Sequence, residues 1–181
     1  MVRHAPTHAA RMVGWTDLPA DLSDAESLGS LHNSLPMAPI VSSDLARAVD
    51  TATAIAHGRP RLAHDSDLRE FNYGDWEDQP FERIDSPALR AFFDAPGAIP
   101  APGGESWDDV SARTCAAIDG LARGKDDLIV VTHMGVILTQ WARATGLSPY
   151  RALAQKIDNL SVTRIDLAAS GAVPIFANHH P

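Results

Sequence analysis

The sequence predicts an α/β fold: a three-layer sandwich with a mostly parallel central sheet, helices on both faces and an antiparallel edge strand. Short apolar runs at residues 39–42 and 128–131 are each followed by a helical pattern, which is typical of strand–helix units in a parallel sheet. The C-terminal stretch LSVTRIDLAASGAVPIFA indicates two strands joined through Ala-Ser-Gly. Pro174 in the last of them fits a sheet edge, where a missing N–H donor is tolerated.

Length and composition fit a single domain spanning residues 1–181. The chain is 45% hydrophobic and 21% charged, as in ordinary globular proteins, and its formal net charge is −8. This charge gives no long-range attraction for nucleic acid or anionic membranes, so neither is an expected partner. The single cysteine, Cys115, excludes an internal disulfide, and no apolar run reaches the roughly 18 residues that span a membrane. We expect a cytoplasmic protein.

The first expected strand is short, because only Met1 and Val2 precede Arg3 and His4. Both polar side chains are costly to bury without partners, so their place at a strand end needs an explanation. The brevity of the strand leaves open a natural start upstream of Met1.

The second strand is expected at residues 39–42 and leads into a helix. Ser43 or Asp44 is the predicted N-cap of this helix. Its inward-facing stripe consists of Leu45, Val49, Ala52 and Ile55.

Two further helices are predicted on the same grounds. Ser106 is a good N-cap for the first of them. The inward side of that helix carries Val110, Thr114, Ile118 and Leu121. After the apolar run at 128–131, a second helix is expected from about Gly135, and Gly146 marks its end.

Residues 64–105 do not follow this alternation of strands and helices. The stretch is rich in Pro, Gly, Asp and aromatic residues, and only residues 87–93 have a helical pattern. Long irregular stretches in compact α/β domains are usually functional, so we expect a lid-like excursion here.

Polar residues with phosphate-binding chemistry follow three of the expected strands. They are Arg3 and His4 after the first, Ser42, Ser43 and Arg47 after the second, and Thr132 and His133 after the third. If these strands are parallel and adjacent, two arginines and two histidines meet at one edge of the sheet, beside helix N-termini. In an acidic protein, this cluster predicts a site for a phosphate-like dianion.

Five motifs extend over nearly the whole chain: VRHAPT, SSDLARAVDTA, LREFNYGDWED, PGGES and VVTHMGVI. In this order they resemble the motifs of the histidine phosphatase, or phosphoglycerate-mutase-like, superfamily. The first motif alone would be weak evidence, whereas five in order are specific.

The resemblance implies a mechanism for the cluster. His4 would be the nucleophile and would form a phosphohistidine. Arg3, Arg47 and His133 would hold the oxygens of the transferred phosphoryl group. Glu70 would protonate the leaving oxygen and then deprotonate the attacking water.

Four positions depart from the family's usual pattern, and none of them removes a residue that does chemistry. They are Ala5, Ala10, Asp78 and Met134. The backbone N–H of Met134 can still bind substrate, and Thr7 is a further candidate contact, with capping of a turn as its alternative role. His4 and His8 have the spacing of metal ligands, but Pro6 places them in a loop, so we expect no metal and no cofactor.

The acidic excursion favours a phosphatase over a mutase. A phosphoglycerate mutase holds a second anionic group, yet between residues 71 and 109 the only basic residues are Arg83 and Arg90 among many acids. We therefore expect a phosphomonoesterase acting on a small phosphorylated molecule whose leaving group is neutral or only weakly charged. The alternatives are mutase-type phosphoryl transfer and a catalytically inactive phospho-ligand-binding module. GWTDLPADLS resembles the α-ribazole phosphatase branch without fixing a substrate, and the oligomeric state, a homodimer included, stays open.

Overall fold

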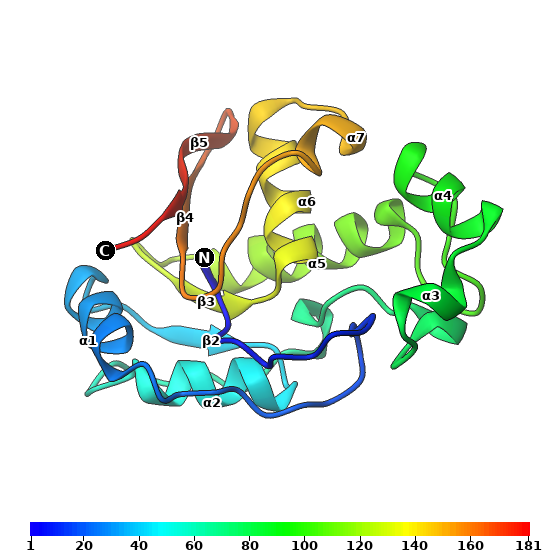
Figure 1. Cartoon of the computed structure of the whole chain (residues 1–181). Coiled ribbons are helices and arrows are strands. Elements are labelled where there is room, and N and C mark those ends of the chain that lie inside the picture. Colours follow the sequence, from blue (N-terminus) through cyan, green and yellow to red (C-terminus); the bar gives the residue numbers. More distant parts are fainter.

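The computed structural model describes all residues from 1 to 181 and contains one five-stranded sheet (Figure 1). The strands are β1 (Val2–Arg3), β2 (Ile40–Ser42), β3 (Ile129–Thr132), β4 (Val162–Ala168) and β5 (Gly171–His179). Their order across the sheet is β2-β3-β1-β4-β5. β1 and β2 pair with β3 in parallel, and β4 pairs antiparallel with both β1 and β5. The predicted mostly parallel sheet with an antiparallel edge is therefore confirmed.

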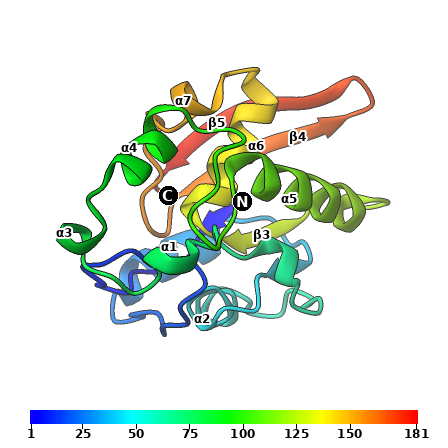
Figure 2. The same cartoon turned by 90° about the vertical axis from the view of Figure 1, so that its right-hand side faces the viewer.

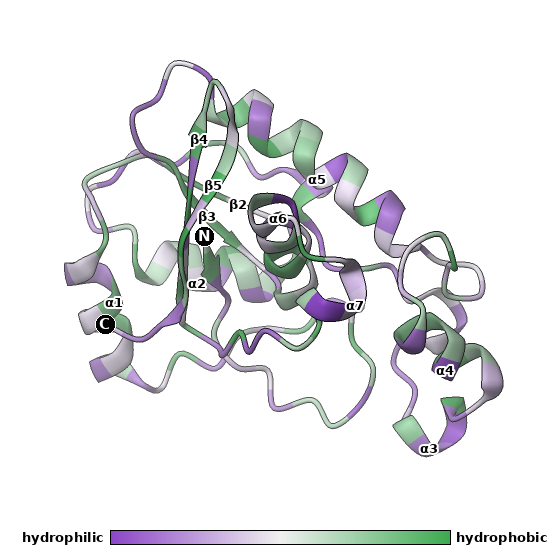
Figure 3. Ribbon diagram, turned by 90° about the horizontal axis from the view of Figure 1, so that it is seen from above, coloured by the Kyte–Doolittle hydropathy of each residue, from purple (hydrophilic) through white to green (hydrophobic).

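Helices cover both faces of the sheet, which confirms the three-layer arrangement. One face carries α1 (Ala25–Ser34) and α2 (Ala46–Ala54), and the other carries α5 (Trp107–Ala122) and α6 (Met134–Thr145). Figure 2 shows α2 below β3 and the pair α5 and α6 above it. In Figure 3, green hydrophobic residues concentrate on the central strands, where both faces are covered.

Successive residues of the central strands enter different hydrophobic clusters. Ile40 and Ile129, which are register partners, pack with buried residues of α1 and α2. Val41 and Val130, the next pair, pack with Ile118 of α5 instead. This alternation follows from the two-residue period of a strand, in which successive side chains point to opposite faces of the sheet.

The helix ends agree with the sequence in two cases and differ in one. Ser106 caps α5 in a reciprocal capping box with Asp109, and Gly146 ends α6 in the left-handed conformation at φ 69°. The predicted cap of α2 is wrong, because its N-cap is Leu45, which has no side-chain cap.

Neither predicted cap residue of α2 has its side chain free for that role. The Ser43 hydroxyl lies 2.7 Å from His133, and the Asp44 carboxylate pairs with Arg69. The first-turn N–H of Ala46 donates instead to the Asp17 carboxylate, at 2.7 Å. An acidic side chain from a distant loop therefore stabilises the start of α2.

The segment 64–105 contains short helices joined by turns. They are η1 (Ser66–Leu68), η2 (Gly74–Trp76), α3 (Phe81–Ile84) and α4 (Pro87–Asp94). The helix predicted at 87–93 is confirmed, whereas the other three were not expected. Phe71, Trp76 and Phe92 are buried in the same hydrophobic cluster as residues of α6, so this segment supplies part of the core. That it acts as a lid stays a prediction.

Two more helices were missed from the sequence, α1 and α7 (Pro149–Ala152). α1 buries only Leu31 completely, so its apolar stripe is too thin to stand out. The C-terminal hairpin is confirmed, with Pro174 opposite Ile165 in the edge strand β5. None of the helices has the length and apolar character that crossing a bilayer requires.

Candidate active site

Three parallel strand ends meet at one edge of the sheet. Val2 is the register partner of Val131 and Arg3 that of Thr132, so β1 and β3 end level with each other. The backbone N–H of His4 donates to the carbonyl of Thr132 at 3.0 Å. The rings of His4 and His133, which follow these two strands, have their centroids 5.0 Å apart. The predicted convergence of the strand ends is therefore present in the fold.

His4 is buried, with its side-chain tautomer set by the backbone. Its Nδ1 lies 2.7 Å from the carbonyl oxygen of Ala5. A carbonyl only accepts, so Nδ1 donates its hydrogen and the lone pair is on Nε2. Burial, then the Arg47 charge and to a smaller extent Arg3, lower the pKa of His4 to about 3, against the opposing effect of the Ala5 carbonyl. The imidazole is consequently neutral near pH 7.

His133 is fully buried beside His4 and retains one unpartnered nitrogen. Its Nε2 lies 2.7 Å from the hydroxyl of Ser43, while its Nδ1 has no hydrogen-bond partner in the protein. Burial lowers the pKa of His133 well below its usual value, and the nearby His4 and Arg47 lower it further. A buried nitrogen without a partner is costly unless a bound group satisfies it.

Two arginines bring positive charge to this edge without a carboxylate hydrogen-bonded to either. The buried Arg47 donates from Nη1 to the carbonyl of Thr16, at 3.0 Å, and from Nη2 to that of Gly14. Arg3 donates from Nη1 to the carbonyl of Ile157, and its buried Nε has no partner. Burial lowers the pKa of both arginines, and the Glu70 carboxylate opposes that effect. The guanidinium groups keep their charge and can bind an oxyanion.

Glu70 lies beside the start of α6, where two backbone N–H groups orient its carboxylate. The donors are Phe71, at 2.9 Å, and Gly135, at 3.0 Å. A Cβ at position 135 would lie 2.3 Å from Glu70 Oε1 and 2.5 Å from the ring of Phe71. Glycine is therefore required there, because the helix start and the carboxylate approach so closely.

Of the remaining predicted contacts, Met134 begins α6 directly after His133 and Thr7 follows His4 in the same loop. Met134 is exposed, and its N–H is among the first four of the helix, which have no intrahelical partner. Thr7 is half-buried. Asn159, from the loop after α7, donates to the carbonyl of His4 at 2.8 Å and fixes this loop from the other side.

Two residues that support the site were not identified as such from the sequence. Arg113 of α5 donates to the carbonyls of Asp67, Arg69 and Glu70 and pairs with Glu105 at 2.7 Å, so it holds the loop that carries Glu70. Contacts to backbone carbonyls have no sequence signal.

Glu77 is the second support, and its carboxylate accepts five hydrogen bonds. The donors are the N–H groups of Gly14, Trp15, Thr16 and Tyr73 and the hydroxyl of Thr16, at 2.6–3.1 Å. Two of these residues, Gly14 and Thr16, present the carbonyls that bind Arg47. In the sequence, Glu77 could have been noticed only from its place in the motif GDWED.

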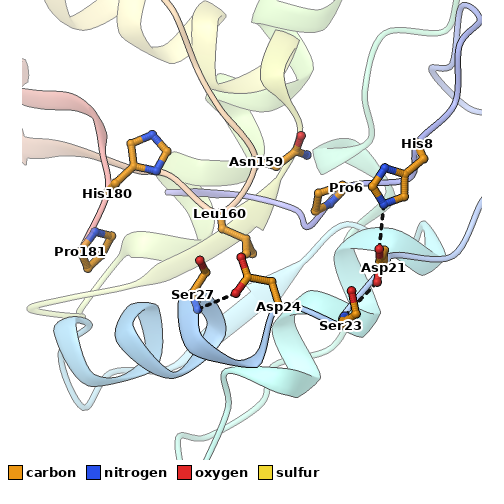
Figure 4. A pocket seen from close by; sticks show the side chains of 10 residues that line it. All are labelled: Pro6, His8, Asp21, Ser23, Asp24, Ser27, Asn159, Leu160, His180 and Pro181. Carbon is orange, nitrogen blue, oxygen red and sulfur yellow. Dashed lines mark hydrogen bonds and ion pairs between the residues drawn. The ribbon is translucent and has the colours of Figure 1, made fainter.

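A separate cavity lies outside this cluster of residues. It has a volume of about 340 Å³, and no arginine or glutamate, nor His4 or His133, lines it. Figure 4 shows its walls, with His8 and Asp21 pointing toward one another across a 2.7 Å contact. Asn159 lines this cavity and also donates to the His4 carbonyl, so the cavity borders the loop that carries His4.

Comparisons with known proteins identify the family. The model of the histidine phosphatase superfamily (branch 1) matches residues 1–179. Glucosyl-3-phosphoglycerate phosphatase of Mycolicibacterium vanbaalenii is 33% identical over 172 residues, which cover 81% of this chain and 73% of that protein. The metal-independent phosphoserine phosphatase of Arabidopsis thaliana is 32% identical over 189 residues, covering 92% and 75%.

Solved structures agree with these relatives. Bacillus stearothermophilus YhfR superposes with a TM-score of 0.85 at 26% identity, covering 96% of this chain and 92% of that one. A mycobacterial glucosyl-3-phosphoglycerate phosphatase gives a TM-score of 0.83 at 29% identity, covering 100% and 98%. The curated relatives named here are phosphatases of small phosphorylated metabolites. From its fold, its clustered strand ends and these matches, the chain belongs to the histidine phosphatase superfamily, branch 1.

Proposed function

We propose that this protein is a phosphomonoesterase that hydrolyses a small phosphorylated metabolite through a phosphohistidine on His4. The observation that carries the proposal is the state of the His4 ring. Its Nδ1 donates to Ala5, its pKa is about 3, and its Nε2 lone pair is available beside two guanidinium groups. A neutral, oriented imidazole near positive charge is suited to attack the phosphorus of a dianionic ester.

In the first step, His4 Nε2 forms a bond to phosphorus while the bond from phosphorus to the ester oxygen breaks. Arg3 and Arg47 stabilise the negative charge on the phosphoryl oxygens, and the unpartnered Nδ1 of His133 is a further contact for them. Thr7 and the N–H of Met134 complete the substrate contacts. His4, Arg47 and His133 are buried and already hydrogen-bonded within the protein before substrate arrives, so little reorganisation of these groups is needed.

Glu70 is the acid and base of both steps. Protonated at the start, it transfers its proton to the leaving oxygen, and as a carboxylate it then removes a proton from the attacking water. The water oxygen bonds to phosphorus, the bond to His4 breaks and phosphate is released. The N–H groups of Phe71 and Gly135 hold the Glu70 carboxylate at the start of α6 throughout.

A phosphatase fits the surroundings of the site better than a mutase. Residues 71–109 contain two basic side chains, Arg83 and Arg90. The charge of Arg90 is already paired with Asp85. A second phosphate would find little compensating charge there. We further propose that residues 1–181 act as one domain in the cytoplasm, with the segment 64–105 covering the site.

The test is hydrolysis of p-nitrophenyl phosphate by the wild type and by His4→Ala, with the exposed His8→Ala as the matched control. We expect His4→Ala to lose at least about a thousandfold in kcat and His8→Ala to keep wild-type rates. Acid-labile labelling of the protein by substrate phosphate, absent in His4→Ala, would support the covalent step.

Three results would contradict the proposal. Equal rates in His4→Ala and the wild type would remove His4 from the chemistry. Binding of phosphate without turnover from acid to neutral pH would indicate a binding module. Interconversion of 3- and 2-phosphoglycerate that outruns hydrolysis would indicate a mutase.

A further inference from the structure

A second, apolar cavity adjoins the cluster of His4, Glu70 and His133. Ten residues line it, eight of them hydrophobic and none carrying a charge at neutral pH. Its walls come from the segment 64–105, from α5, from α6 and from the end of α7, represented by Phe71, Trp107, Met134 and Leu153. Burial, with the Glu70 and Glu77 carboxylates, raises the pKa of Tyr73 well above its usual value, so the one ionisable group of the lining stays neutral.

The cavity is linked to the catalytic cluster through residues that follow Glu70 and His133 in the chain and line the cavity. Phe71 follows Glu70, and its N–H donates to the Glu70 carboxylate at 2.9 Å. Met134 and Gly135 follow His133, and the Gly135 N–H donates to the same carboxylate at 3.0 Å. The group proposed to protonate the leaving oxygen is therefore held by two residues of the cavity wall.

The rim and the size of the cavity suit a short apolar group. Phe93 of α4 is 37% exposed and Met134 of α6 is 39% exposed, so two apolar side chains of the lining also reach solvent. The cavity measures about 40 Å³, a few times the roughly 10–15 Å³ that one water molecule needs. A group of a few carbon atoms fits this space and displaces water from apolar walls.

We propose that this cavity is the leaving-group subsite of the phosphatase and that it selects monoesters of short, uncharged, apolar alcohols. This inference rests on the proposed function, because it places the alcohol part of the ester beside Glu70. A leaving group with a carboxylate or an ammonium would lose hydration against walls that offer no opposite charge. The proposed selectivity differs from that of relatives named for phosphoserine or glucosyl-3-phosphoglycerate.

The test uses methyl, ethyl, propyl and butyl phosphate, whose alcohols have nearly equal acidity, so their intrinsic reactivity is similar. Each added methylene that enters the cavity should raise kcat/KM about fourfold, which corresponds to about 0.8 kcal/mol of apolar burial. The gain should appear mainly in KM, because the ground state and the transition state bury the chain equally. Phosphoserine and 3-phosphoglycerate should be poorer substrates than butyl phosphate.

Two phenylalanines of the segment 64–105 provide matched variants. Phe93→Ala removes a rim residue of the cavity, whereas Phe81→Ala removes a 51% exposed ring that does not line it. Phe93→Ala should reduce the ratio of the butyl to the methyl kcat/KM several-fold, and Phe81→Ala should leave that ratio at the wild-type value. Thermal melting of both variants checks that the fold is retained.

The outcomes separate the subsite from the catalytic proposal. A flat chain-length series, or a preference for phosphoserine over butyl phosphate, would overturn the subsite while leaving the phosphatase intact. If no ester is hydrolysed, the proposed phosphatase activity is wrong. The subsite is then tested separately, by measuring the affinities of methyl- to butylphosphonate by calorimetric titration. Affinity that rises with chain length, and rises less in Phe93→Ala, supports the subsite, whereas equal affinities contradict it.

Discussion

At the scale of single residues, burial and positive charge act together on His4 and His133, the two histidines of the candidate active site. His4 is 7% exposed and His133 is fully buried, so each loses hydration if it becomes protonated. The guanidinium of Arg47 lowers the pKa of both rings further. An imidazole nitrogen can attack phosphorus only when it is unprotonated. Because the lowered pKa values hold only in the folded chain, the free energy of unfolding depends on pH.

We predict that the free energy of unfolding falls as the pH decreases from about 6.5 to about 3. In that window the unfolded chain protonates His4, whose ordinary pKa is 6.5, while the folded chain keeps it neutral because burial and the nearby arginines lower its pKa to about 3. The unfolded state therefore binds more protons, and stability declines by up to about 1.4 kcal/mol per pH unit for this one group. Below about pH 3 the loss from His4 is complete.

Urea denaturation at pH 4, 5, 6 and 7 measures this slope. Replacing the ring in His4→Asn should make the slope shallower by up to the same 1.4 kcal/mol per unit, and His179→Asn, at an exposed position, is the matched control. An unchanged slope in His4→Asn would mean that His4 titrates alike in the folded and unfolded chains.

A second prediction concerns Gly135. In Gly135→Ala the added methyl would meet Glu70 Oε1 at 2.3 Å and the Phe71 ring at 2.5 Å, so the carboxylate or the start of α6 has to move. Because a displacement of about 1 Å costs on the order of a hundredfold in rate, we expect kcat for p-nitrophenyl phosphate to fall by that factor. Steady-state kinetics measure it.

The matched control for this change is Gly120→Ala in α5, where nothing lies within 4 Å of the added Cβ. This variant should keep full activity and gain up to about 1 kcal/mol of stability from helix propensity. If Gly135→Ala retained wild-type kcat, Glu70 would not need the position that the structure gives it.

At the scale of elements, the loop at residues 11–16 is joined to the segment 64–105 by many contacts. Met12 exchanges backbone hydrogen bonds with Asp78 and Gln79, and Arg11 pairs with Asp78 at 2.9 Å. The indole Nε1 of Trp15 donates to the carbonyl of Glu70 at 2.8 Å. These contacts fix the carbonyls that bind Arg47, so the loop at residues 11–16 and the segment 64–105 together determine where one charge of the candidate site lies.

We predict that Glu77→Gln loosens this junction. The amide keeps one acceptor oxygen in place of two and brings an NH₂ group toward the N–H donors of residues 14–16. Loss of charged, half-buried hydrogen bonds should cost about 2 kcal/mol of stability. KM for p-nitrophenyl phosphate should rise because Arg47 is less well held, and kcat should fall less.

Glu82→Gln, on the exposed face of α3, is the control and should leave both the melting temperature and KM unchanged. If Glu77→Gln lowered stability but left KM as in the wild type, the carboxylate would support the fold without positioning Arg47.

At the scale of the whole molecule, the order of the strands brings the residues of the candidate site together. The same order explains which of these residues could be predicted from the sequence. His4, Arg47 and His133 follow strands or begin helices, and a run such as LIVVTH marks both the strand and its end. Parallel pairing of β1, β2 and β3 then brings their ends together. Glu70 follows no strand, so only the resemblance to a family indicated it.

What could not be predicted depends on contacts between distant segments. Asp17 caps α2 in place of Ser43, and Arg113 binds the carbonyls of Asp67, Arg69 and Glu70. Backbone carbonyls are the same in every residue, so the sequence carries no trace of which arginine they bind. Helix α1 was missed because its buried surface is small, not because its sequence opposes a helix.

A site assembled from strand ends exists only in the folded chain, so an anion that fills it should stabilise the whole molecule. We predict that inorganic phosphate, the expected product, raises the free energy of unfolding by about 2.7 kcal/mol when present at a hundred times its dissociation constant. Thermal melts with phosphate, against sodium chloride at the same ionic strength, measure the effect. Arg47→Met keeps an unbranched side chain in the buried position but removes the charge, and should abolish most of the shift. A shift of equal size in chloride would mean that phosphate stabilises this acidic protein through general screening. An undiminished shift in Arg47→Met would mean that Arg47 does not bind the anion.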